Sequence, residues 1–217
     1  MMDLYFVRHG KTQWNLEGKY QGSHGDSPLL PESIDDIKLL AHRLKDIPFQ
    51  HAYTSPILRA KRTAELLLDD LGKKIPLTEV DGLKEFDLGD MEGQRFVDLE
   101  KQIPDVIHAF REEPEKYDAA KIHGESFESV IERSNAAINK IVSEYHDDAC
   151  LLLVSHGAAL VAMIQALLGT SIADLRKNGG LSNSSLTHLK YDNGHYSLVK
   201  WNETKFLNKK LSSTDTI

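Results

Sequence analysis

Short apolar runs alternate along the chain with longer stretches of helical spacing. The runs Leu4–Val7 and Cys150–Val154 have the continuous apolar character of strands that are buried on both faces. Ala52–Thr54 and Ile75–Val80 are two shorter strand candidates. Because helical segments separate these runs, the pattern predicts a central, mostly parallel sheet.

The helical segments are recognised by their apolar spacing and by the residues at their ends. We expect Ser33 and Ser55 to cap the first two long helices, since serine is a preferred N-cap. Gly72 is expected to end the second of these helices. Further helices are predicted over 125–145 and directly after Gly157.

The remaining segments predict a hairpin and an inserted lobe. Leu186–Trp201 is typical of two strands that turn at Asp192-Asn193-Gly194. Between about 90 and 124 the pattern is looser, and prolines break short helical stretches, which indicates a helical lobe inserted over the core. The expected fold is α/β with three layers and a mostly parallel central sheet, as a single domain over 1–217.

Composition narrows the class of protein. A chain of 217 residues is long enough to bury a core without crosslinks, and its one cysteine, Cys150, excludes a disulfide framework or a multi-cysteine zinc site. The first residues lack the features of a signal peptide. The longest mainly apolar stretch, Ala158–Leu168, is shorter than the ~20 residues of a membrane span. We therefore expect a cytoplasmic protein with no membrane partner.

The net charge disfavours nucleic-acid partners but is compatible with a small anionic substrate. The formal net charge is −7, which argues against nucleic-acid binding because that requires a basic surface. A small anionic substrate remains compatible, since a local cluster of cations can attract it within an acidic protein. The sequence shows no metal-ligand spacing, so we expect no metal and no cofactor. It does not predict an oligomeric state.

Two predicted strands end in similar polar sequences. Arg8-His9-Gly10 follows the first apolar run, and Ser155-His156-Gly157 follows the late one. Ligands of open α/β sheets bind beyond the carboxyl ends of the strands. If the two strands are central neighbours, His9 and His156 face one crevice, and the glycine after each allows close approach of a ligand.

A third cationic position, Arg59, lies in the first turn of the helix expected after Ser55. A cation there opposes the helix dipole, an arrangement that is reasonable where an anion lies between the two. Guanidinium forks match phosphate oxygens, and a neutral imidazole is a nucleophile at pH 7. The combined set suits phosphoryl transfer, and comprises Arg8, His9, Arg59 and His156.

Several motifs in order resemble one known family. Arg8–Asn15 reads R-H-G-K-T-Q-W-N and resembles the R-H-G-x-T-x-x-N motif of the histidine phosphatase superfamily, whose fold is phosphoglycerate mutase-like. The resemblance covers nearly the whole chain, and its other motifs are Gln21-Gly22 with Asp26–Leu29, Ser55–Ala64, Leu83–Gly93, Gly124–Ser126 with Arg133, and Val154–Gly157.

The resemblance implies a role for each matched residue. His9 would be the nucleophile that becomes phosphohistidine. Glu85 would protonate the leaving alcohol and then activate the water that cleaves the phosphohistidine. The transferred phosphoryl oxygens would be held by Arg8, Arg59 and His156. Further substrate-binding positions would be Asn15, Gln21, Gly22 and the amide of Gly157.

Some positions depart from the family pattern or have no implied role. The loop at 21–26 is one residue longer than usual, and Leu30–Ser33 replaces the common helix entry. These departures affect the substrate-facing rim rather than the phosphate pocket. His24 is interpreted as an exposed loop histidine, and the carboxylates interpreted as a solvated loop are Asp87, Asp90 and Glu92.

The choice between branches of the family depends on the number of cations. Leu88 occupies the position of a tyrosine in cofactor-dependent mutases, and the chain lacks their Arg-Arg pair. Fewer cations suit a monophosphate better than a bisphosphate. We therefore expect a metal-independent phosphomonoesterase of the histidine acid phosphatase type, whose partner is a small phosphorylated substrate.

Other functions stay open. A cofactor-dependent phosphoglycerate mutase, a non-catalytic phosphate-binding regulator and a phosphatase of protein phosphohistidine would carry the same residues. Gly10-Lys11-Thr12 does not complete a P-loop, because Tyr5 stands where that loop requires glycine.

Overall fold

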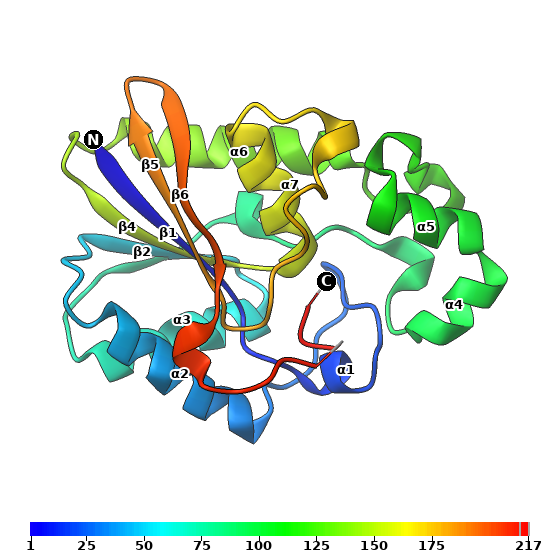
Figure 1. The fold of residues 1–217 in the computed structure, drawn as a ribbon, viewed down its shortest axis with the longest axis horizontal. Helices are drawn as coiled ribbons and strands as arrows, with labels where there is room; N and C mark the ends of the chain where they lie inside the picture. The colour runs from blue at the N-terminus through cyan, green and yellow to red at the C-terminus, as the bar shows by residue number, and fades with distance from the viewer. Residues whose placement is uncertain (213, 217) are drawn as a thin grey trace.

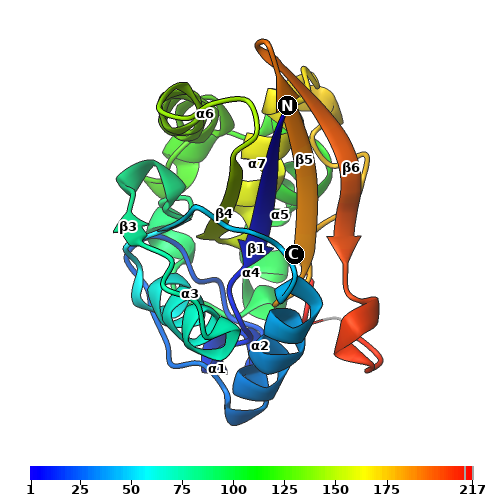
Figure 2. The ribbon, with the colours of Figure 1, turned by 90° about the vertical axis from the view of Figure 1, so that its left-hand side faces the viewer.

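The computed structural model describes residues 1–212 and 214–216, and within them a six-stranded sheet lies between two layers of helices (Figure 1). The strand order is β3-β2-β4-β1-β5-β6, with the β5–β6 hairpin at one edge (Figure 2). Strands β1 to β4 pair in parallel, whereas β5 and β6 pair antiparallel. The mostly parallel sheet and the α/β class are confirmed. The strands are β1 (Met2–Arg8), β2 (His51–Thr54), β3 (Leu77–Glu79), β4 (Cys150–Ser155), β5 (Leu186–Asp192) and β6 (His195–Glu203).

Helices cover both faces of the sheet. On one face lie α2 (Pro31–Leu44) and α3 (Leu58–Leu71), and on the other lie α6 (Phe127–Ser143) and α7 (Gly157–Leu167) (Figure 1). The short helix α1 (Gln13–Leu16) follows β1. Single 3₁₀ turns lie at Asp81–Leu83, Gly89–Met91, Pro114–Lys116, Ala119–Ile122, Ile172–Asp174 and Lys205–Leu207.

The alternation of side chains along β1 divides the core into two clusters. Leu4 and Phe6 pack in the cluster that contains residues of α6 and α7. Tyr5 and Val7 pack in the cluster that contains residues of α2 and α3. Because a strand presents successive side chains to opposite faces, both layers are fixed by one continuous apolar strand.

Two predicted helix caps are wrong. Helix α2 begins at Pro31, and the hydroxyl of Ser33 instead donates to the carbonyl of Lys11 at 2.7 Å. Helix α3 begins at Leu58, so Ser55 lies before its first turn. Proline suits the first helical position, which explains the early start of α2. Gly72 ends α3 as predicted, with a left-handed φ of 62°.

The segment after β3 contains α4 (Phe96–Gln102) and α5 (Pro104–Glu112), which lie together to one side of the sheet (Figure 1). They pack in a third cluster that includes Phe86 and Phe127. The division of 1–217 into one domain with a lobe over 90–124 stays a prediction. Over the described residues, no helix has the length and apolar character needed to cross a membrane.

Candidate functional site

The pairing of β1 with β4 brings two histidines together. Arg8 lies opposite Ser155 in the parallel register, so the next residues, His9 and His156, emerge side by side. The ring centroids are 5.2 Å apart, with an interplanar angle of 60°. Both rings are buried, with 3% of His9 and 0% of His156 exposed. The structure therefore places the two predicted histidines in one site.

One tautomer of His9 is fixed by its neighbours. Its Nδ1 lies 2.8 Å from the carbonyl of Gly10, and a carbonyl only accepts, so Nδ1 carries the proton. In the neutral ring Nε2 then carries a lone pair instead of a proton, and this lone pair accepts from Nε of Arg59 at 3.3 Å. Burial, with the charges of Arg59 and Arg8, holds the pKa of His9 well below its usual value. His9 is therefore a neutral imidazole with a basic Nε2.

His156 is held in a similar way but with one nitrogen unpaired. Its Nε2 lies 2.8 Å from the hydroxyl of Ser55, whose oxygen accepts from the amide of Ile57 at 3.3 Å. Its Nδ1 is buried and has no hydrogen-bond partner within the described residues. Burial, followed by the charge of Arg59, keeps the pKa of His156 well below the usual value.

Arg8 is fully buried and also keeps unpaired donors. Its Nη1 donates to the carbonyls of Leu181 and Asp215, at 2.5 Å and 2.9 Å. Its Nε and Nη2 find no partner among the residues that the structure describes. Burial lowers its pKa to about 10, so the guanidinium stays charged at neutral pH. A Cβ at Gly157 would lie 3.0 Å from Nε of Arg8, so glycine lets the guanidinium approach the start of α7.

Arg59 connects the first turn of α3 to the loop at 21–26. Its Nη2 donates to the carbonyls of Gln21 and Gly22, at 3.2 Å and 2.9 Å. Its Nη1 donates to the carbonyl of Gly25 at 2.8 Å and pairs with Asp26 at 3.1 Å. Arg59 therefore holds this loop next to His9.

Glu92 holds the same loop from the other side. Its carboxylate accepts from the amides of His24 and Gly25, so the interpretation of Glu92 as a solvated loop residue is wrong. A Cβ at Gly22 would lie 2.4 Å from Glu92 Oε1 and 2.7 Å from the carbonyl of Phe86, so only glycine fits there. The ring of His24 is exposed, as predicted.

Glu85 is buried at the start of α7. Its Oε1 accepts from the amides of Phe86 and Ala159, at 2.9 Å and 2.8 Å. Its Oε2 accepts from the amide of Ala158 at 3.1 Å. Negative charge is favourable at a helix N-terminus, so the carboxylate acts as the cap of α7. It is also the largest favourable charge acting on both Arg8 and Arg59.

An ion pair clamps the backbone that carries Glu85. Arg133 on α6 pairs with Glu125 through two nitrogens, at 2.7 Å and 2.9 Å. The same guanidinium donates to the carbonyls of Gly82, Lys84 and Glu85, each at 3.0 Å. Both residues belong to the G-E-S…R motif of the sequence, for which no role was assigned.

The predicted residues Asn15 and Gln21 support the site. The side-chain oxygen of Asn15 accepts from the amide of Thr12 at 3.1 Å, which caps the turn after His9. With its amide oriented to satisfy its neighbours, Gln21 donates to Thr12 and accepts from Nε of Arg59 at 3.0 Å. Their roles toward a substrate stay predictions.

Three supporting residues were not identified from the sequence. Ser55 contacts His156, and the hydroxyl of Thr63 accepts from the amide of Gly10 at 3.0 Å. Both lie in the Ser55–Ala64 motif, which is a usable signal. Asn183 donates to the carbonyl of His9 at 3.1 Å from a polar loop that no pattern distinguishes.

The C-terminal segment also contacts the site. Lys11 forms an ion pair with Asp215 at 2.9 Å, and the Asp215 carbonyl accepts from Arg8. No group of three or more His, Cys, Asp or Glu side chains that could hold a metal occurs in 1–212 and 214–216. What converges here is a set of cationic and neutral donors, which is suited to an oxyanion.

The two neutral histidines predict a loss of stability in mild acid. Below pH ~6.5 the unfolded chain binds protons at these residues and the native state does not, so the free energy of unfolding falls as pH falls. We expect the contribution of the pair to the slope to grow as pH falls and to approach about 3 kcal/mol per pH unit near pH 5. Urea unfolding between pH 5 and 7 measures it.

The variants H9N and H156N serve as controls for this prediction. Each should remove about half of this contribution, since each removes one titrating group. An unchanged slope in both variants would contradict neutral, buried imidazoles.

Comparisons with known proteins agree on a family. Residues 4–204 match the model of the histidine phosphatase superfamily (branch 1). The chain is 32% identical over 169 residues to the uncharacterized phosphatase PhoE of Bacillus subtilis, covering 78% of this chain and 79% of that protein. It is 31% identical over 210 residues to the probable phosphoglycerate mutase GpmB of Cronobacter sakazakii, covering 93% and 90%. The solved structure of Bacillus stearothermophilus YhfR superposes with a TM-score of 0.87 at 29% identity, covering 95% of this chain and 100% of that one. The chain that carries this pair of buried histidines belongs to the histidine phosphatase superfamily.

Proposed function

We propose that the protein is a phosphomonoester phosphatase that acts through a phosphohistidine on His9. One observation carries the proposal. Beside His9, whose Nε2 carries no proton, buried nitrogens of two residues lack partners among the described residues. They are Nε and Nη2 of Arg8, and Nδ1 of His156, which is a donor when Nε2 accepts from the Ser55 hydroxyl. Unpaired buried donors are costly, and the three oxygens of a phosphoryl group would satisfy them.

The reaction has two steps. His9 Nε2 attacks phosphorus, the bond from phosphorus to the alcohol oxygen breaks, and Glu85 gives that oxygen a proton. A water then attacks phosphorus, Glu85 takes its proton, and the N–P bond breaks to release phosphate. Arg8, Arg59, His156 and the Gly157 amide stabilise the charge on the phosphoryl oxygens in both steps.

Hydrolysis is favoured over transfer back to a second hydroxyl by two features. The position of the mutase tyrosine is occupied by Leu88, which is buried, with 3% exposed. Its apolar side chain offers no polar group to a substrate. Glu85 lines a cavity of about 350 Å³ together with Ser23 and Glu125, which gives water a route to the proposed acid. The mutase is the second candidate, because the relatives include proteins named as phosphoglycerate mutases.

We expect the purified protein to hydrolyse p-nitrophenyl phosphate and small alkyl phosphate monoesters without added metal or 2,3-bisphosphoglycerate. H9N should lose at least ~10³-fold in kcat, because no nucleophile remains. Two measurements detect the phosphohistidine: a burst of p-nitrophenol release, and the transfer of acid-labile ³²P from a labelled phosphomonoester to the protein. Full activity in H9N would exclude the mechanism, and conversion of 3-phosphoglycerate to its isomer without hydrolysis would favour the mutase.

A second prediction concerns Arg133, which positions Glu85. R133Q removes the donors to three backbone carbonyls, so the Glu85 carboxyl should shift from its place and lower kcat for an alkyl phosphate by up to ~100-fold. Release of p-nitrophenol in a single turnover should change less than ~3-fold, because this leaving group needs little protonation.

The control for this test is R62Q. It removes an arginine on α3 that forms an exposed ion pair with Glu65 at 3.2 Å, and both substrates should be unaffected. An equal loss on both substrates in R133Q would show a general structural role instead of positioning of the acid.

A further inference from the structure

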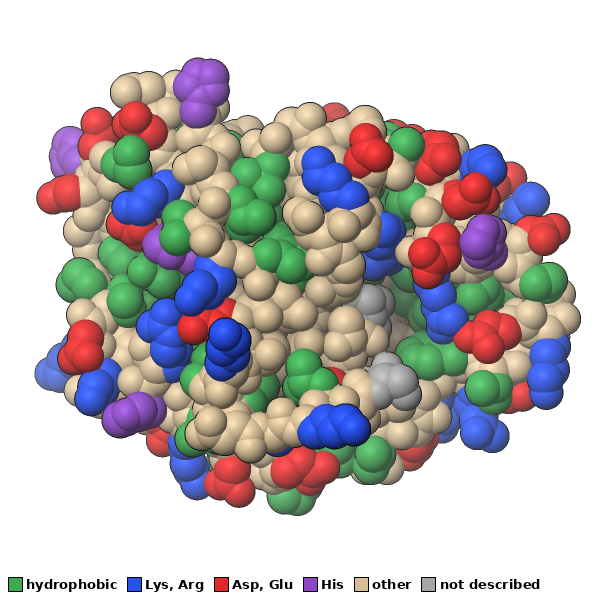
Figure 3. Space-filling view, viewed as in Figure 1, with side chains coloured by type: hydrophobic (Ala, Val, Ile, Leu, Met, Phe, Trp, Pro, Cys, Tyr) green, Lys and Arg blue, Asp and Glu red, His purple; other side chains and the backbone are tan. Residues whose placement is uncertain are grey.

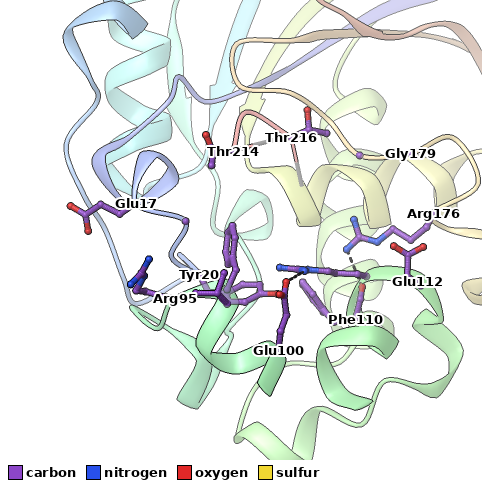
Figure 4. Close-up of a pocket in the computed structure, with 15 residues that line it drawn as sticks. Glu17, Tyr20, Arg95, Glu100, Phe110, Glu112, Arg176, Gly179, Thr214 and Thr216 are labelled. Carbon is purple, nitrogen blue, oxygen red and sulfur yellow. Dashed lines mark hydrogen bonds and ion pairs between the residues drawn. The ribbon is translucent and has the colours of Figure 1, made fainter. Parts of the chain in front are cut away.

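A second feature is a cavity of about 560 Å³ between α4 and α5, the loop after α7, and the two residues Thr214 and Thr216 (Figure 4). The surface is hollowed beside α4 and α5, with Lys or Arg side chains at the edge (Figure 3). The C-terminal residues Thr214 and Asp215 connect this cavity to the proposed phosphate pocket. Thr214 lines the cavity and accepts from Lys11 at 2.8 Å, and the next residue, Asp215, contacts Arg8.

Aromatic rings form one wall of this cavity. Tyr20 and Phe96 pack edge to face, with centroids 4.5 Å apart. Arg111 lies over both, with its Cζ at 5.5 Å and 5.2 Å from the two centroids. Such a wall suits a flat, apolar group in the ligand.

Three arginines line the cavity. Arg95 is exposed, and the other two differ in their partners. Arg111 is neutralised by Glu100, at 2.5 Å. Arg176 has no carboxylate oxygen within 4.0 Å among the described residues, although Glu112 also lines the cavity. Among the described residues, Arg176 donates only to the carbonyl of Phe110, at 3.1 Å, and its buried Nε has no partner.

Arg176 therefore carries a charge that its surroundings compensate incompletely. Burial lowers the pKa of this guanidinium, as expected for a cation shielded from water. An unpaired guanidinium at a cavity wall is stabilised by an anion, and its planar fork matches a carboxylate with two hydrogen bonds.

We infer that this cavity receives the alcohol part of the substrate, and that Arg176 pairs with a carboxylate at the far end of that part. The substrate class is a phosphate monoester of a flat, preferably aromatic, carboxylic acid. The inference rests on the proposed function, since it assumes that His9 takes the phosphoryl group. Arg176 then determines specificity and takes no part in the chemistry.

The test compares an acid and its neutral isostere, 3-(4-phosphooxyphenyl)propionate and the corresponding propionamide. We expect the wild-type protein to prefer the acid by about 10-fold or more in kcat/KM, as a charge-assisted pair predicts. R176Q should bring the ratio close to one while leaving kcat/KM for the amide within ~3-fold. If an ester is hydrolysed too slowly to measure, its affinity is obtained instead from its inhibition of p-nitrophenyl phosphate hydrolysis, and the affinities of the acid and the amide are compared.

Two matched variants complete the experiment. K177Q removes a charge from the neighbouring exposed residue, which does not line the cavity, and should leave the ratio unchanged. E112Q removes the competing carboxylate and should raise the ratio, a result that does not depend on the folding of R176Q. A wild-type ratio near or below one, or a preference retained in R176Q, would overturn the inference while the phosphatase assignment stands. Loss of all hydrolysis in the wild type would instead overturn the proposed function and this inference with it.

Discussion

The parallel register between β1 and β4 is the constraint on which the site depends. Neighbouring strands lie about 4.8 Å apart, and this spacing sets the distance between His9 and His156 once Arg8 faces Ser155. Side chains alternate between the two faces of a sheet, so a slip of one residue would send the imidazoles to opposite faces. The continuous apolar sequences of the two strands, buried between helices on both sides, hold this register.

Positive charge is concentrated in this buried site. Arg8 and Arg59 are both almost fully buried, and the carboxylate of Glu85 offsets only part of their charge. Burial, together with these cations, lowers the pKa of His9 and of His156, so the same environment favours an anion and keeps His9 unprotonated. Burial of charge is thus the physical origin of both properties.

The sequence predicted those parts of the molecule that follow from local pattern. The strands, the end of α3 at Gly72 and the pairing of His9 with His156 all follow from periodicity and strand ends. The starts of α2 and α3 were wrong, because Ser33 and Ser55 found partners distant in sequence. The resemblance was needed to choose Glu85 among nearby carboxylates. Asn183 and Arg176 could not be predicted, since loop packing alone places them.

The proposed acid role of Glu85 would link proton transfer to the electrostatics of α7. As a carboxylate it neutralises the positive end of the helix through the amides of Ala158 and Ala159. When it takes up a proton this neutralisation disappears, and the helix end becomes more attractive to any nearby anion. In the proposed mechanism the helix N-terminus would therefore face negative charge alternately on Glu85 and on the phosphoryl group, and the affinity for the substrate would depend on where one proton resides.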